Sequence, residues 1–375
     1  MKEISKAIGY RPTWAQVNLD NIAYNFAQIR NKFSPGLKIM STVKADAYGH
    51  GLMPVAKRLA ACGTDYFGVA SIDEGIQLRR IGIKIPILVL GLILKGDIAP
   101  LFKYNLIPTV CTKELASVIN KMAAQKGRPF KIHVKVDTGM GRIGVLQEDA
   151  DKLIEGIHRM KFINIEGLFT HFAFADMNKK FTLYQIGLFN RLIAKLKKKG
   201  IHIRLIHAAN SMGILGYKES HFNMVRPGLI LYGLYPRPGL GVKLRPALSL
   251  KSRVVYLKRT PKGCGISYGH IYITKKETTV VTIPIGYGDG YPRNLSNKAP
   301  VLIRGRSFNI SGRICMDQIM VDVGNMPVKL GDEVVLIGTQ KKRSVSVERL
   351  AFLSGTIPYE IVCGLGSRVP RIYEG

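Results

Sequence analysis

The chain has 375 residues, of which 46% are hydrophobic and 22% charged, a composition typical of a globular protein. Lysine and arginine number 56 against 25 acidic residues, which gives a formal net charge of +31. Such an excess could favour nucleic acids or anionic membranes. However, the basic residues are scattered, the longest cluster is Lys195–Lys199, and no nucleic-acid motif is present, so we expect no specific nucleic-acid partner.

The cysteines and the apolar runs restrict the compartment. Five widely spaced cysteines without a Cys-x-x-Cys pair indicate neither a disulfide framework nor a zinc site, and we expect no metal. The segment Met1–Trp14 lacks the apolar core of a signal peptide. The strongest apolar run, Ile85–Leu94, is half as long as a membrane-spanning helix. We therefore expect a cytoplasmic protein without a membrane partner.

Strands and helices alternate through the first two-thirds of the chain. Asp20 is expected to cap a first helix, and Ser71 with Glu74 forms a capping box at a later one. Strand-like runs recur between the helices: Lys38–Val43, Tyr66–Ala70, Ile87–Leu90, Ile107–Val110, Phe130–Val136, Ile165–Thr170, Ile203–His207 and Phe222–Arg226. About eight strands in such alternation predict a closed (β/α)8 barrel of the α/β class.

Beyond Pro246 the pattern changes to short strands rich in valine and isoleucine, separated by glycine, proline and asparagine. We predict two domains. A barrel domain spans residues 1–245, with the option that its first residues, up to about 17, pack with the other domain. A mostly β C-terminal domain spans residues 246–375.

Polar residues cluster where the predicted barrel strands end, which is the catalytic face of such a barrel. A lysine amine in a partly desolvated pocket can form a Schiff base, and the loops after strands seven and eight commonly bind phosphate. Taken singly, each residue is as consistent with a rim or packing role. The candidates are Lys44, Tyr48, Lys135, Arg142, His171, Asn210, Ser211, Arg226 and Gly228.

Residues 42–51, TVKADAYGHG, resemble the cofactor-lysine motif of the alanine racemases, isomerases that use pyridoxal 5′-phosphate (PLP). Further runs resemble the same family in the same order, so the resemblance covers most of the chain. They are THFA (170–173), HAANS (207–211), MVRPG (224–228), SYG (267–269), IGYGDGYPR (285–293), CMDQ (315–318), PYE (358–360) and RVPR (368–371).

The resemblance implies a role for each candidate residue. Lys44 carries PLP, and Lys44 with Tyr268 are the two bases that serve the D- and L-enantiomer respectively. The substrate is bound by Arg142, Met316 and Tyr268, and Lys135 matches a lysine that is carbamylated in some members. The expected cofactor-binding residues are Lys44, Tyr48, His171, Asn210, Ser211, Arg226, Gly228 and Tyr359.

Two of these roles carry physical expectations. Arg226 faces the pyridine nitrogen in this family, and a guanidinium donates a hydrogen bond without giving up its proton. A tyrosine acts as a base at neutral pH only if neighbouring cations lower its pKa, and His171 and the arginines are the candidate cations for Tyr268. The resemblance also implies homodimers that share their active sites, and interconversion of L- and D-alanine that supplies D-alanine for cell-wall peptidoglycan.

Three other functions compete. A barrel-only PLP-binding protein would lack the second domain and Tyr268. A decarboxylase of similar architecture would place an acidic residue where Arg226 stands. The strongest alternative is a racemase of broader range, acting on serine or basic amino acids, because a pocket separates homologous side chains by only ~1–3 kcal/mol per methylene.

Overall fold

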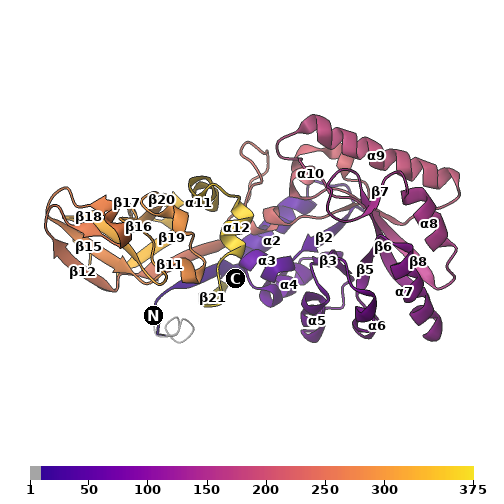
Figure 1. Ribbon diagram of the computed structural model, residues 1–375, viewed down its shortest axis with the longest axis horizontal. Coiled ribbons are helices and arrows are strands. Elements are labelled where there is room, and N and C mark those ends of the chain that lie inside the picture. Colours follow the sequence, from indigo (N-terminus) through magenta and orange to yellow (C-terminus); the bar gives the residue numbers. More distant parts are fainter. Residues whose placement is uncertain (1–9) are drawn as a thin grey trace.

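The computed structural model describes residues 10–375, and it consists of a barrel and a β domain placed end to end (Figure 1). Eight parallel strands close the barrel, because β10 pairs with β2 on one side and β5 pairs with β6 on the other. Each strand falls within or beside one of the predicted runs, so the barrel prediction is confirmed. The strands are β2 (Lys38–Thr42), β3 (Tyr66–Val69), β4 (Ile87–Val89), β5 (Ile107–Val110), β6 (Phe130–Asp137), β8 (Ile163–Phe169), β9 (Leu205–His207) and β10 (Met224–Val225).

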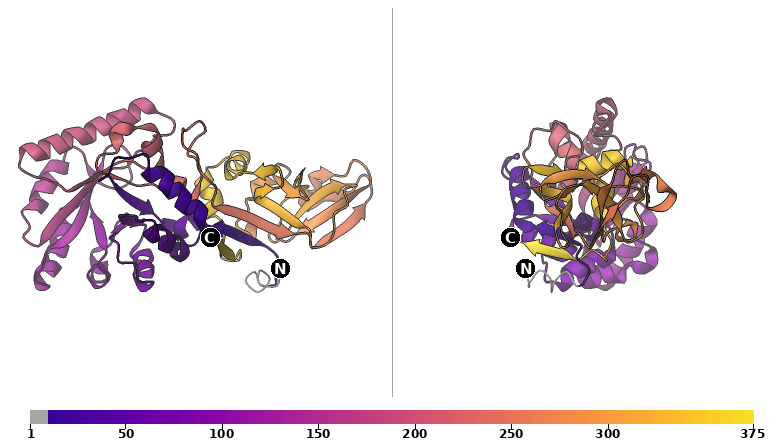
Figure 2. Two further views of the ribbon diagram at one scale, coloured as in Figure 1. Left: turned by 180° about the vertical axis from the view of Figure 1, so that it is seen from behind. Right: turned by 90° about the vertical axis from the view of Figure 1, so that its left-hand side faces the viewer.

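Helices surround the barrel on the outside (Figure 2). Apolar side chains inside the barrel form a small core of their own, while a larger core joins the outer strand faces to the helices and continues into the β domain. The covering helices are α2 (Leu19–Arg30), α4 (Leu52–Ala61), α5 (Ile72–Arg80), α6 (Ala99–Tyr104), α7 (Lys113–Gln125), α8 (Ala150–His158) and α9 (Lys179–Lys198).

The first helix begins earlier than predicted. Asn18, not Asp20, caps α2, because its side-chain oxygen accepts a hydrogen bond from the Asn21 amide at 2.7 Å. Asp20 lies inside the first turn and pairs with Arg58 of α4. An acidic residue is favourable in a first turn as well as at a cap, so composition alone does not separate the two positions.

The β domain contains a large sheet, a three-stranded sheet and a hairpin. Strand β1 precedes the barrel in the chain but lies in the large sheet, antiparallel to β11 and parallel to β21. The large sheet comprises β1 (Trp14–Asn18), β11 (Leu248–Arg253), β16 (Pro300–Ile303), β17 (Arg306–Asn309), β19 (Glu333–Gln340), β20 (Arg343–Val345) and β21 (Arg371–Glu374). The smaller sheets comprise β12 (Tyr256–Thr260), β15 (Thr278–Ile283) and β18 (Ile319–Gly324), and β13 (Gly265–Ile266) with β14 (Tyr272–Ile273).

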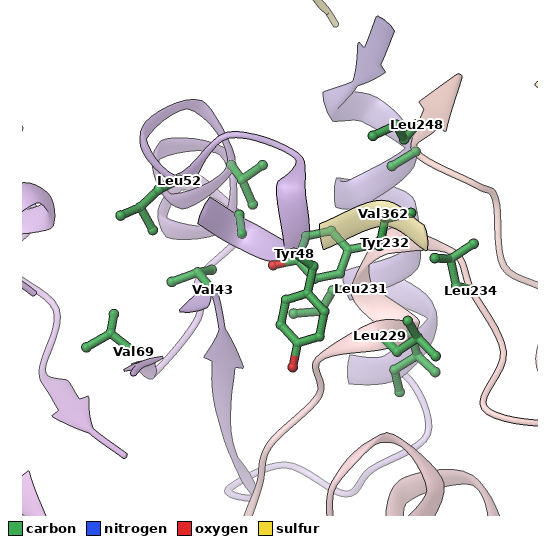
Figure 3. Close-up of a cluster of buried hydrophobic side chains, with 14 of the residues drawn as sticks. Val43, Tyr48, Leu52, Val69, Leu229, Leu231, Tyr232, Leu234, Leu248 and Val362 are labelled. Carbon is green, nitrogen blue, oxygen red and sulfur yellow. The ribbon is translucent and has the colours of Figure 1, made fainter. Parts of the chain in front are cut away.

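Helices α11 (Val347–Ser354) and α12 (Pro358–Cys363) lie where the β domain meets the barrel (Figure 1). Figure 3 shows this junction, where Val362 of α12 lies near Tyr48 and Tyr232 of the barrel. The rings of Tyr48 and Tyr232 are 4.9 Å apart between centroids, and both are buried. Among residues 10–375, no helix combines the length and apolarity that crossing a membrane requires.

Candidate active site

The loop after β2 has an unusual backbone. Lys44 begins α3 (Lys44–Gly49), yet Ala45, Asp46, Ala47 and Tyr48 have φ angles of 53°, 52°, 53° and 55°. These angles are left-handed, and none of the four residues is glycine. A left-handed turn costs about 1–2 kcal/mol per L-residue, so contacts from elsewhere must offset the strain.

Glu74 of α5 supplies one of these contacts and is itself held by a second hydrogen bond. Its carboxylate accepts hydrogen bonds from the amides of Ala45 at 2.6 Å and Ala70 at 2.7 Å. The predicted capping box is therefore only half right. The Ser71 hydroxyl does accept from the Glu74 amide at 3.3 Å, but the Glu74 side chain turns to the lysine loop and to Ala70. Because that loop is a distant segment, local sequence could not reveal the role of Glu74.

A cavity of about 390 Å³ opens beside this loop at the carboxyl ends of the barrel strands. Every predicted site residue lines it except Tyr268 and Met316. Thr42, Leu90, Ile143, Phe169 and Ile357 line it as well and were not predicted. The predicted residues in the wall are Lys44, Tyr48, Lys135, Arg142, His171, Asn210, Ser211, Arg226, Gly228 and Tyr359.

Hydroxyl groups and close-lying backbone form one part of the wall. The Gly228 amide donates to the Ser211 hydroxyl at 3.1 Å, and the Tyr48 and Tyr359 rings are 5.8 Å apart. A Cβ atom on Gly228 would lie 2.4 Å from the Tyr48 hydroxyl oxygen, so only glycine fits here. Asn210 caps the short helix α10 (Ser211–Gly216), accepting from the Gly213 amide at 2.9 Å.

Cations form the other part, around the face of Phe169. The Lys135 ammonium nitrogen lies 4.5 Å and the Arg226 guanidinium carbon 5.5 Å from the Phe169 ring centroid. Arg226 donates to the Thr170 and Ala208 carbonyls at 2.7 and 2.9 Å, which fixes its direction. Phe169 shows no polar signal in the sequence, so its role could not be inferred there.

Burial and mutual repulsion shift the pKa values of these groups. Burial, followed by the charge of Arg142, lowers the pKa of Lys44. Burial, followed by the charges of Arg226 and Arg142, lowers the pKa of Lys135 well below its usual value. Burial lowers the pKa of Arg226 to about 9, which leaves it protonated at neutral pH. Both lysines are thus displaced toward the neutral, nucleophilic amine.

His171 lines the cavity beside Arg226, and its expected influence on Tyr268 stays a prediction. It is buried, and burial together with the charges of Arg226 and Lys135 holds its pKa well below the usual value. Its Nδ1 atom lies 3.4 Å from Arg226 Nη2. Burial and these neighbouring charges thus favour the neutral imidazole.

Tyr268 and Met316 lie elsewhere in the chain. Both belong to the β domain, and they are 70% and 53% exposed respectively. A single chain therefore does not bring either residue to Lys44. Within residues 10–375, no cluster of three or more histidine, cysteine, aspartate and glutamate side chains is placed to hold a metal ion.

Comparisons with known proteins identify the family. The profile of the alanine racemase N-terminal domain matches residues 17–236, and that of the alanine racemase C-terminal domain matches residues 247–373. The chain belongs to the alanine racemase family. It is 48% identical over 368 residues to the alanine racemase of Halothermothrix orenii, covering 97% of each chain. The predicted domain boundary between residues 245 and 246 lies in the segment between the two matches, and residues 1–9 lie outside the described residues.

Solved structures show the same fold. An alanine racemase from Clostridium difficile superimposes with a TM-score of 0.91 at 42% identity, covering 97% of this chain and 96% of that one. A histidine racemase from Leuconostoc mesenteroides superimposes with a TM-score of 0.89 at 30% identity, covering 98% and 99%. The second protein has the same fold but is named for a different amino acid, so the fold alone does not determine the substrate.

Proposed function

We propose that this alanine racemase family member interconverts L-alanine and D-alanine with PLP held in the described cavity. One observation carries the proposal: the cavity wall contains the partly desolvated amines of Lys44 and Lys135, the cations Arg142 and Arg226, and a cluster of hydroxyls. No aspartate or glutamate lines it among the described residues. Such a wall suits a ligand with several negative charges and an aldehyde that a lysine can capture.

The residues present fit PLP in two regions. The Ser211 and Tyr48 hydroxyls, with the backbone at Gly228, would hold the phosphate, and Tyr359 borders the same region. Arg226 would donate to the ring nitrogen. When bound, PLP supplies an electron-accepting ring that makes the Cα proton of an amino acid acidic. A guanidinium keeps its own proton, so the ring nitrogen would remain unprotonated, which disfavours transamination.

Racemisation requires a proton to leave Cα on one face and to return on the other. The Lys44 amine serves the face of the D-enantiomer, and the Tyr268 hydroxyl serves the face of the L-enantiomer. Each positioned acid or base typically contributes ~10²–10⁴-fold to the rate. Burial lowers the pKa of Lys44, so a larger fraction of its amine is unprotonated near neutral pH than in a surface lysine. Only the unprotonated amine can accept the Cα proton.

The substrate carboxylate would meet Arg142 and the backbone amide of Met316. Lys135 would carry a carbamate in this arrangement, since the neutral amine is the form that reacts with carbon dioxide and its pKa is well below normal. A carbamate would also place one negative charge beside Arg142 and Arg226, whose charges lower that pKa. Mass spectrometry of the intact protein in bicarbonate, compared with Lys135→Ala, would reveal the modification.

The site is shared between two copies of the chain. Two observations support this: Lys44 lines the cavity, whereas Tyr268 and Met316 are exposed on the β domain, where a second copy of the chain could present them to the cavity. A two-fold axis would make both borrowed contacts equivalent. The proposed assembly is therefore a head-to-tail homodimer.

Mixed dimers test the shared site. Lys44→Ala and Tyr268→Phe homodimers should each be nearly inactive. Co-refolding equal amounts makes heterodimers of about half the dimers, each with one restored site, so recovery should approach about a quarter of wild-type activity. If Tyr268 acted within its own chain, no mixed dimer would hold an intact site, and confirmed heterodimers without activity would refute sharing.

Cofactor attachment and substrate range test the activity itself. Borohydride reduction of the PLP-loaded protein should fix the pyridoxyl group on Lys44, and peptide mapping to another lysine would contradict the assignment. Racemisation should be measured with alanine, serine, lysine, arginine and histidine. A preference for a substrate other than alanine would favour the broader racemase. With alanine as substrate, the biological role we propose is cytoplasmic supply of D-alanine for peptidoglycan.

A further inference from the structure

Four buried polar side chains form a column through the barrel interior beneath the cavity. Arg226 Nη1 lies 2.8 Å from His207 Nδ1, and His207 Nε2 lies 3.0 Å from His133 Nδ1. His133 Nε2 lies 3.6 Å from Glu166 Oε2. The exposed fractions of Arg226, His207, His133 and Glu166 are 5%, 0%, 0% and 2%. The column therefore joins the arginine of the site to a carboxylate deep in the barrel.

The two imidazole rings are held in place by their neighbours. The His207 ring stacks on Phe169 at 4.8 Å with an interplanar angle of 6°. The His133 ring lies against Gly167, where a Cβ atom would come within 2.4 Å of Nδ1. Pairing of β6 with β8 shifts register at this point, so that Ile132 faces Ile165 and His133 faces Gly167. Glu166 is the extra residue, and such a bulge re-aims a side chain.

Glu166 is ionised and anchored at its other oxygen. Arg204 and Lys131 contact Oε1 at 2.8 and 2.7 Å. Burial alone would raise the pKa of Glu166, but its contacts with His133 and Lys131 hold it at about 2. Tyr66 also faces this carboxylate and bonds Arg204 at 3.1 Å. Glu166 Oε1 thus accepts from Arg204 and Lys131, and Glu166 Oε2 faces His133.

The positions of the protons follow from the two ends of the column. Arg226 can only donate, so His207 Nδ1 must accept, which places the His207 proton on Nε2. That proton points at His133 Nδ1, which must accept in turn, so the His133 proton is on Nε2 and faces Glu166. His133 Nε2 and Glu166 Oε2 have no other hydrogen-bond partner among the described residues.

Protonated rings do not fit this arrangement. A doubly protonated His133 would donate toward His207 as well as toward Glu166, forcing the His207 proton onto Nδ1 against the N–H groups of Arg226. Burial and the charge of Arg226 also lower the pKa values of both histidines. Other basic groups face the two ends of the column: Lys135 lies near Arg226 at one end, and Lys131 and Arg204 contact Glu166 at the other.

We propose that Glu166 is a positioning residue that sets the tautomers of His133 and His207, and thereby holds Arg226 as a donor toward the cavity. Only the last step, in which Arg226 faces PLP, rests on the proposed function. The tautomers themselves depend on the barrel interior alone and can be observed without cofactor.

Glu166→Gln provides a sharp test because the replacement has the same shape. Arg204 and Lys131 can only donate, so they hold the amide oxygen and turn the amide NH₂ toward His133. His133 Nε2 must then accept, its proton moves to Nδ1, and the His207 proton moves to Nδ1 as well. The column then ends in an N–H group of His207 directed at an N–H group of Arg226.

The measurement is long-range ¹H–¹⁵N correlation on full-length protein labelled at histidine nitrogen, without PLP. In the wild type, both His133 and His207 should show the Nε2–H tautomer. In Glu166→Gln, that tautomer should be lost from both rings. Lys131→Met is the matched control, since it removes one donor from the same carboxylate but leaves both rings as in the wild type.

PLP affinity provides the second readout. Glu166→Gln should weaken PLP binding by about tenfold or more, because opposed donors displace Arg226, while Lys131→Met should not. If Glu166→Gln fails to fold, Gly167→Ala replaces it, since the added methyl displaces the His133 ring and should abolish the His133–His207 contact. Unchanged tautomers in Glu166→Gln, PLP binding at wild-type affinity in the variant that folds, or an Nδ1–H or charged ring in the wild type would overturn the proposal. If the protein bound no PLP but showed these tautomers, the proposed function would fail and the tautomer assignment would stand.

Discussion

Replacing Glu74 tests whether the strained lysine loop limits cofactor binding. The Glu74 carboxylate accepts amide hydrogen bonds from Ala45 at 2.6 Å and Ala70 at 2.7 Å. Hydrogen bonds to a charged group contribute about 1.5–3 kcal/mol each. Both of these are exposed, and only the Ala45 bond belongs to the lysine loop, so Glu74→Ala should cost the ordered loop ~1.5 kcal/mol. The left-handed turn at residues 45–48 then loses one of the contacts that offset its strain.

The loss should appear in PLP affinity, because capture of the aldehyde requires Lys44 in its ordered position. A cost of ~1.5 kcal/mol corresponds to a dissociation constant raised by about tenfold. Glu74→Gln keeps an acceptor for one of the two amides, so a smaller rise, about threefold, is expected. Spectroscopic titration of the PLP-free protein measures both values.

Asp73→Asn is the matched control, since Asp73 is the exposed neighbouring acid on the same helix turn. It should bind PLP as the wild type does. Amide hydrogen exchange should also accelerate at residues 45–52 in Glu74→Ala and not in Asp73→Asn. Wild-type affinity and exchange in Glu74→Ala would show that the turn is stable without this carboxylate, and the reasoning would be wrong.

Two further substitutions probe the cavity wall. Gly228→Ala puts a Cβ atom 2.4 Å from the Tyr48 hydroxyl oxygen, so it should lower stability by ~1–3 kcal/mol and weaken PLP binding, as seen by thermal unfolding and titration. Gly241→Ala, where a Cβ atom would meet nothing within 4 Å, should be neutral, and equal effects of the two would refute the steric argument. Arg142→Gln removes a charge that lowers the pKa of Lys44, so that pKa should rise and the pH at which Lys44 becomes half-reactive toward an amine reagent should move upward. A downward or absent shift would show that Arg142 does not act on Lys44 through its charge.

Sequence patterns predicted the barrel well because its strands are short buried runs bounded by helices, and each such run is a local signal. They also predicted that the polar residues at the strand ends lie together, and these residues do line one cavity, since strand ends of a barrel share one face. The role of Glu74 was missed because its partners, Ala45 and Ala70, belong to different loops. The left-handed turn was missed because alanine and tyrosine carry no local preference for it.

The buried column shows a different limit. His133, His207 and Glu166 occupy three different strands. The alternation of polar and apolar residues along one strand does not show whether a polar side chain points into the barrel. Only closure of the barrel brings them within contact of one another. Strand β1 also depends on distant partners, because it precedes the barrel in the chain yet pairs with β11 and β21.

The pairing of β1 has a consequence for synthesis on the ribosome. Its antiparallel partner β11 begins at Leu248, and its parallel partner β21 spans Arg371–Glu374. A nascent chain that has just completed the barrel therefore carries β1 with both edges unpaired, and one edge stays open until β21 has been made. An open edge is a template for pairing with other chains. The interval between completion of the barrel and synthesis of β21 is thus a period in which newly made copies are exposed to aggregation.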